Sequence, residues 1–188
     1  MSPASEFLDR LQPPDLKAFF DYWQRKRGSR LAPGRGDIDP SEMRRFLPQI
    51  YMFDVVEPGP RFRFRLIGTS VASVIGDLTG QFIEETLSPE VLPRHIEHMV
   101  DVTETLAVRY MVGDLAWQDR PHIRFHRLLL PLSDDQLRAN ILLGIAHYLG
   151  VGEKRQGEAP GASVVPGPAS SVTKIADARL AAGDIPPA

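Results

Sequence analysis

The sequence predicts an α+β protein whose five-stranded antiparallel sheet is interrupted, after its second strand, by helices. Apolar residues recur at spacings of three and four in residues 14–27, the period of an amphipathic helix. From Ile50 the period changes to two, which is typical of strands. A second helix signal at Ser88-Pro89 is followed by three more strand-like stretches. This order of elements indicates an α+β domain with antiparallel pairing.

The opening helix is predicted at residues 14–27, PDLKAFFDYWQRKR. Leu16, Phe19, Phe20 and Trp23 share one face of it. Such an apolar face has two uses: it covers the protein's own sheet, or it anchors a partner such as a second copy of the chain.

The elements that follow are bounded by caps and breakers. A short helix is expected after Asp39, and short helices and turns over residues 70–87. Ser88 can cap a long helix that ends near Val108. The remaining strands are expected at about 109–117, 122–132 and 138–149, the last nearly all apolar and therefore central.

Residues 50–56 and 61–68, joined by EPGP, predict a hairpin whose register follows from its polarity. We expect the pairs Val56–Arg61, Val55–Phe62, Asp54–Arg63, Phe53–Phe64, Met52–Arg65 and Tyr51–Leu66. A slip by one residue would bury Asp54 on the apolar face without a partner. Asp54 and Arg63 are therefore predicted as cross-strand partners, with the arginines on the outer face of the sheet and their stems against the opening helix.

The two ends of the chain differ in composition from the middle. Residues 1–13 are expected to be a flexible N-terminus. Residues 150–188 begin with a stretch rich in Gly, Pro and Ser that buries little surface, so we predict a disordered tail with a weak helix at about 171–182. The predicted domain covers residues 14–149.

Composition excludes several classes of function. The net charge of −2 gives no general attraction to nucleic acid or to an anionic membrane. No apolar run is long enough to span a bilayer, and no signal peptide is visible, so we expect a cytoplasmic protein. The absence of cysteine excludes disulfides, thiolate metal sites and cysteine nucleophiles.

The candidate ligand-binding residues are histidines and aromatic residues. His95 and His98 share a face of the long helix, and they are either a metal or haem ligand pair or partly exposed polar residues. Since no third ligand completes a set, we predict no metal. Strand alternation puts His122 and His126 on one face with Arg124, as an anion site or as a plain polar face. A bulge near His126 or Arg127 would explain the change of apolar phase that follows. The full set is His95, His98, Tyr110, Trp117, His126 and Tyr148, of which the aromatic residues also suit a core.

Several stretches together give the sequence a resemblance to a known family. They are YWQRKRG, DIDPSEMRRFLPQIYMFDV, RFRFRLIGTSV, GDLTGQFIEE and HRLLLPLSDD with LLGIAHY. The sequence resembles a PAS sensor domain, and more specifically the bacterial group labelled "PAS domain, family 5", over residues 14–149. The resemblance implies the strand order 2-1-5-4-3, a pocket between the sheet and the helices, and a sensory role. It names no cofactor, and it gives the opening helix a place on the outer sheet face or across a dimer.

The sequence leaves three functions open. The favoured one is a non-catalytic sensory or regulatory module acting through ligand or protein binding, whose output passes to a separate signalling protein. The alternative is a small α+β ligand carrier or enzyme with a base in a cavity between sheet and helices, but the residues lack a convergent acid–base set. A nucleic-acid binder using the arginine row is disfavoured by the net charge.

Overall fold

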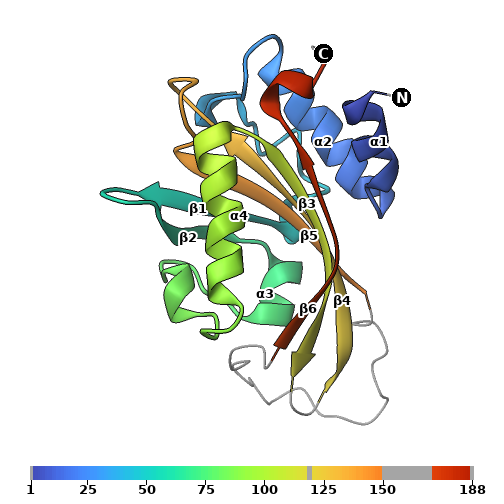
Figure 1. The fold of residues 1–188 in the computed structure, drawn as a ribbon, viewed down its shortest axis with the longest axis vertical. Coiled ribbons are helices and arrows are strands. Elements are labelled where there is room, and N and C mark those ends of the chain that lie inside the picture. Colours follow the sequence, from blue (N-terminus) through green and yellow to red (C-terminus); the bar gives the residue numbers. More distant parts are fainter. Residues whose placement is uncertain (1, 118–119, 150–170, 187–188) are drawn as a thin grey trace.

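The computed structural model describes residues 2–117, 120–149 and 171–186. Its centre is a six-stranded antiparallel sheet with the spatial order β2-β1-β5-β4-β3-β6 (Figure 1). The strands are β1 (Ile50–Val56), β2 (Arg61–Ile67), β3 (Val108–Trp117), β4 (Arg120–Leu132), β5 (Ile141–Leu149) and β6 (Ser171–Leu180). The α-helices are α1 (Pro3–Arg10), α2 (Pro14–Arg27), α3 (Thr69–Ile75) and α4 (Leu92–Thr105). Single 3-10 turns are η1 (Arg35–Asp37), η2 (Leu47–Gln49), η3 (Ile83–Glu85) and η4 (Ala182–Asp184).

The predicted α+β class and the order 2-1-5-4-3 are confirmed, and β6 adds a sixth strand outside β3. The opening helix has the predicted bounds. The long helix begins at Leu92 rather than Ser88, because the Ser88 carbonyl accepts from the Val91 and Leu92 amides in a turn. Turns replace the short helix expected after Asp39, whose carboxylate accepts from the Ser41 amide.

The prediction of a disordered tail is wrong for residues 171–186, and so is the weak helix at 171–182. In β6, Leu180 pairs with Val108 and Ala176 with Val112. Leu180 and Ile185 are buried in the core. The edge of β3 offers unpaired backbone groups, and a strand that completes such an edge needs no strong apolar pattern of its own. The part of the predicted tail at 150–170 lies outside the described residues.

The N-terminus also differs from the flexible segment that we predicted. The Ser2 hydroxyl accepts from the Ser5 amide and caps α1. Phe7 is buried, with its ring centroid 6.1 Å from that of Phe20 on α2, and Leu11 is buried after the helix end. The burial of these side chains holds α1 against the core, and such tertiary contacts decide whether so short a helix forms.

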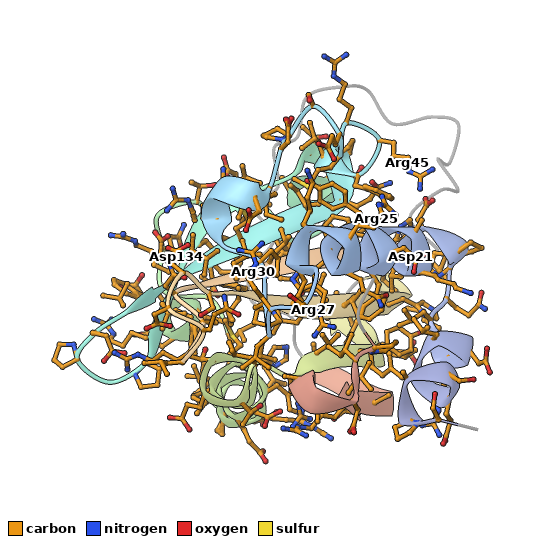
Figure 2. All side chains as sticks on the ribbon, turned by 90° about the horizontal axis from the view of Figure 1, so that it is seen from above. Asp21, Arg25, Arg27, Arg30, Arg45 and Asp134 are labelled. Atoms are coloured by element: carbon orange, nitrogen blue, oxygen red, sulfur yellow. The ribbon has the colours of Figure 1, made fainter. Side chains whose placement is uncertain are left out.

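The sheet has two covered faces, which we name by the helices over them. The α4 face carries Tyr51, Arg127 and Tyr148, because strand pairing places these residues on one side. It is covered by α4 and by α3. The α2 face carries Tyr110 and His126 on the other side. Figure 2 shows α2 and α4 on opposite sides of the sheet.

The β1–β2 hairpin confirms the predicted partnership of Asp54 and Arg63. The register matches the prediction from Val56–Arg61 to Phe53–Phe64, and then a bulge shifts it, so that Met52 pairs with Leu66 and Tyr51 with Ile67. The last two predicted pairs are therefore wrong. The bulge lets Arg65 reach the same carboxylate: the Asp54 oxygens lie 3.2 Å from Arg63 Nη2 and 2.8 Å from Arg65 Nη1.

Candidate ligand site between the sheet and α4

An arginine lies among aromatic side chains on the α4 face of the sheet. Arg127 projects from the middle of β4 toward α4, beside Phe125 of the same strand and opposite Ala146 of β5. Its guanidinium carbon is 4.4 Å from the ring centroid of Phe125 and 5.6 Å from that of Tyr148. Stacking of this kind covers the flat faces of a guanidinium and leaves its N–H edge to bind.

The hydrogen bonds of Arg127 leave part of that edge unused. Nη2 donates to the Tyr148 hydroxyl at 3.1 Å. Nε is buried and makes no hydrogen bond, although other parts of the side chain keep some exposed surface. Among the described residues no carboxylate pairs with Arg127. A guanidinium stays charged at any physiological pH, so this is a buried charge without a counter-charge.

His95 of α4 supplies a neutral group to the same site. Burial, with a further contribution from the charge of Arg127, lowers the pKa of His95 to about 4. Its Nδ1 lies 3.0 Å from the Val91 carbonyl oxygen, which can only accept, so Nδ1 carries the proton and Nε2 is left as an acceptor. At neutral pH the imidazole is therefore an uncharged acceptor facing a positive charge.

Tyr51 of β1 completes the polar set. Its ring lies flat against β5 at Gly144, where an added Cβ would be 2.1 Å from Tyr51 Cζ, so only glycine fits there. Burial raises the pKa of Tyr51, and Arg127 offsets this only in part. The phenol is therefore protonated and can donate. We name Tyr51, His95, Arg127 and Tyr148 the Arg127 cluster.

An apolar wall adjoins the Arg127 cluster on the same face. Leu115, Ile123 and Phe125 of β3 and β4 form a buried group with Val74 of α3, and Tyr148 packs against it. The site thus combines one fixed positive charge, hydroxyl donors, one neutral acceptor and apolar contacts, which is the usual composition of a small-molecule site.

His98, predicted as the partner of His95, lies on the same face of α4 but has a structural role. Its Nε2 is 3.3 Å from an Asp177 oxygen of β6, and its Nδ1 is 3.1 Å from the Met111 sulfur of β3. Arg109 of β3 connects α4 to β6, since it pairs with Asp101 of α4 and with Asp177 of β6. These contacts fix α4 and β6 to β3. In the described part of the chain no group of three or more His, Asp or Glu side chains is placed to hold a metal ion.

Tyr110 and His126 lie on the α2 face, so the sheet separates them from His95 and Tyr148. The Tyr110 hydroxyl is 2.8 Å from His126 Nδ1 and 3.3 Å from the carbonyl oxygen of Gln12, which joins α1 to α2. Burial, and next Arg124, lower the pKa of His126. The predicted ligand set is thus divided between two faces, and this pair holds the N-terminal segment.

The bulge expected in β4 does not form. The predicted bulge near His126 or Arg127 is wrong, because β4 pairs without a shift with both neighbours from Arg124 to Leu129. The apolar phase changes because both faces of the sheet are covered from Leu128 onward. The side chains of Trp117 and His122 lie outside the described part.

Phe19, Phe20 and Trp23, predicted as an interaction surface, cover their own sheet. All three are fully buried, and the Trp23 indole Nε1 donates to the Pro131 carbonyl of β4 at 2.9 Å. Arg27, at the end of the same helix, is buried as well. Its Nη2 donates to the carbonyls of Ile185 and Pro186, both at 2.9 Å, and so ties α2 to the C-terminal segment (Figure 2).

The sequence analysis missed Arg127 and Tyr51 as site residues. The sequence pattern singles out Arg127 only as a position for a bulge, because the apolar phase of its strand changes there. The available signal was its parity: it shares a face with Phe125 and Leu129, so it interrupts an apolar row. A charged residue in such a row is a candidate for function.

The helices inserted after the second of five strands, and packed over one sheet face, define the class of PAS-type sensory folds. The chain belongs to the PAS domain family, whose model matches residues 11–147. This confirms the family that the sequence resembles.

Three solved structures illustrate the likeness, and it extends no further than the fold. The Rhodobacter sphaeroides LOV protein is 11% identical, covering 61% of this chain and 70% of that one, with a TM-score of 0.44. Its d2 variant is 12% identical with the same coverage and TM-score. An RNA-binding light-oxygen-voltage receptor is 15% identical with a TM-score of 0.41, covering 64% of this chain but only 37% of that one. No curated protein matches the chain. Within the described residues no helix is long and apolar enough to cross a membrane.

Proposed function

We propose that this protein is a cytoplasmic, non-catalytic sensory or regulatory module that binds a small molecule between its sheet and the α3 and α4 helices. The observation that carries the proposal is the Arg127 side chain, whose buried Nε makes no hydrogen bond with any residue that the structure describes. Buried polar groups in folded proteins are nearly always satisfied, and an exception calls for a partner such as a water, an ion or a ligand. Membership of a sensory-domain family supports the regulatory role.

The alternative, a ligand carrier or enzyme with a base in the same place, has less support. A general base works best when its pKa is near the working pH, and the pKa of about 4 makes His95 a weak base. Arg127 cannot accept a proton, and Tyr51 holds its own because burial raises its pKa. The cluster is suited to holding a molecule rather than to moving protons.

The output of such a module would pass to a separate signalling protein. Because the apolar face of α2 is buried in its own domain, a homodimer through this helix would use the exposed side, which carries Arg25 (Figure 2). We expect no nucleic-acid or membrane partner. Arg61, Arg63 and Arg65 of the exposed row pair with Glu84 or Asp54, which reduces their attraction for phosphates.

Native mass spectrometry of the protein purified from its own host tests this function. We expect a small molecule bound to each chain, released on denaturation and chemically unchanged after long incubation. The same spectra report the oligomeric state. Conversion of the bound molecule would favour the enzyme alternative. Absence of any bound molecule, together with no chemical-shift change at Tyr51, His95 or Tyr148 in a screen of small apolar and anionic compounds, would contradict ligand binding.

A further inference from the structure

We infer that the molecule bound at the Arg127 cluster is a monocarboxylic acid with an apolar body, whose carboxylate takes the free N–H edge of Arg127. This inference rests on the proposed ligand-binding function and deepens it by naming the class of ligand. It is carried by the geometry around the guanidinium.

Arg127 has an N–H donor that no described residue uses. The Phe125 ring centroid lies 4.4 Å from the guanidinium carbon, and Tyr148 meets the guanidinium through its hydroxyl, so a further partner would bind the donors that these two residues leave. Nη2 is already bonded to Tyr148, whereas Nε donates to nothing in the described structure. A planar carboxylate matches in-plane guanidinium donors in shape and charge.

The Arg127 cluster carries a single positive charge. Arg127 is the only permanent positive charge in the Arg127 cluster, because His95 is neutral and Tyr51 stays protonated. One guanidinium balances one negative charge. A phosphate would bring nearly two, and phosphate sites generally supply more donors and cations than this cluster offers.

The charge lies beside apolar side chains. Next to Arg127 on the same face, Leu115, Ile123 and Phe125 pack with Val74 of α3 in a buried apolar cluster. These side chains can accept only an apolar group. The remaining polar atoms, the Tyr51 hydroxyl and His95 Nε2, are single points that suit one hydroxyl or carbonyl rather than a fully polar metabolite.

The experiment measures binding of paired probes to the full chain by saturation-transfer NMR. Each probe is a carboxylate and its uncharged amide of nearly the same shape: benzoate with benzamide, phenylacetate with phenylacetamide, and isovalerate with isovaleramide. We expect at least one carboxylate to bind at least ten-fold more tightly than its amide. The Arg127→Gln variant should lose this preference. The Arg124→Gln variant should keep it, because Arg124 lies on the same strand, is exposed and points to the other face.

A second measurement does not depend on Arg127→Gln folding. In the unaltered protein, one arginine Nε–H resonance should shift downfield on adding the bound carboxylate and stay in place on adding its amide. Equal binding of acids and amides, or no binding by any acid, would overturn the carboxylate inference. If amides bind on the α4 face while acids show no advantage, the proposed ligand-binding function stands and only the class of ligand is wrong.

Discussion

Two arginines, the buried Arg27 and the partly buried Arg127, lie on opposite sides of the same sheet and have different hydrogen-bond partners. Both lie over aromatic rings, Arg27 at 5.9 Å from Trp23 and Arg127 at 4.4 Å from Phe125, and both have a buried Nε without a partner. Arg27, however, donates to two backbone carbonyls of the C-terminal segment. Arg127 donates to one tyrosine hydroxyl. Arg27 therefore connects α2 to the C-terminal segment, whereas Arg127 has a single hydrogen-bond acceptor among the described residues.

The two faces of the sheet also differ in what their polar side chains bind. On the α2 face, polar side chains bind backbone carbonyls: Trp23 that of Pro131, and Tyr110 that of Gln12. These bonds fix helices and chain ends. On the α4 face, the Arg127 cluster makes one hydrogen bond within itself, from Arg127 to Tyr148, and one to a backbone carbonyl, from His95 to Val91. A stable scaffold on one side thus supports a less satisfied site on the other.

The largest effect is expected from removing an anchor of the α2 face. Trp23→Ala should lower the free energy of unfolding by about 3–5 kcal/mol, because it leaves a cavity and an unpaired Pro131 carbonyl. Chemical denaturation measures this, with the exposed Arg25→Ala as the control. A loss below about 1 kcal/mol would show that α2 is not a structural part of the domain.

The next effect concerns pH and the Arg127 cluster. The pKa of His95 is about 4 in the folded protein and about 6.5 in the unfolded chain. Between these values the unfolded state binds more protons, so the stability contribution is present above pH 6.5 and is lost as the pH falls toward 4. The loss is at most about 3 kcal/mol. His126 and His147, whose pKa values are also lowered, act in the same direction. The unaltered protein and His95→Gln differ in the slope of the unfolding free energy against pH, and this difference isolates the contribution of His95. An NMR titration in which His95 has a midpoint near pH 6.5 would contradict the prediction.

The two arginines can be set against each other directly by replacing each with methionine. Arg27→Met should lower the free energy of unfolding by about 1–3 kcal/mol, because the Ile185 carbonyl loses this donor and the Pro186 carbonyl keeps only Gln24. Arg127→Met should leave it unchanged or raise it by about 1–2 kcal/mol, because an unbalanced buried charge is removed. Denaturation of ligand-free protein measures both. Equal losses in the two variants would show that Arg127 is structural.

Gly144 tests whether the Arg127 cluster depends on the position of Tyr51. Gly144→Ala should cost about 1–3 kcal/mol, because the new Cβ would overlap the tyrosine ring. The double variant with Tyr51→Ala should recover most of this loss, which a double-mutant cycle measures as coupling. Gly36→Ala is the control, since an added Cβ there meets nothing within 4 Å. Absence of coupling would mean that the ring does not lie over β5.

Local pattern was enough for the α+β class, for α2 and for the hairpin as far as Phe53–Phe64, whereas the strand order followed from the resemblance to the PAS family. It failed where long-range contacts decide. Nothing in the composition of residues 171–180 shows that β3 has a free edge, and nothing near Phe7 shows that Phe20 will cover it. Candidate residues were predicted by type, whereas their use depends on which face each strand residue takes. Parity places Tyr110 and His126 beneath α2, and Arg127 beneath α4.

The smallest effect is expected at Asp54, where two exposed arginines share one half-buried carboxylate. Arg63 and Arg65 are each 46% exposed, so water and salt screen their pairs with Asp54. Asp54→Ala should therefore lower the free energy of unfolding by only about 0–1 kcal/mol, and less in 1 M salt than at low salt. Its more specific effect is on the hairpin, since without this carboxylate nothing polar fixes the arginines to one face. Backbone chemical shifts of β1 and β2 report the register. Arg61→Ala, which removes the pair with Glu84 and the contact with the Phe82 ring but leaves Asp54 and its partners, is the control. A loss above about 2 kcal/mol that persists in high salt would show that the pair behaves like the buried charges rather than like an exposed one.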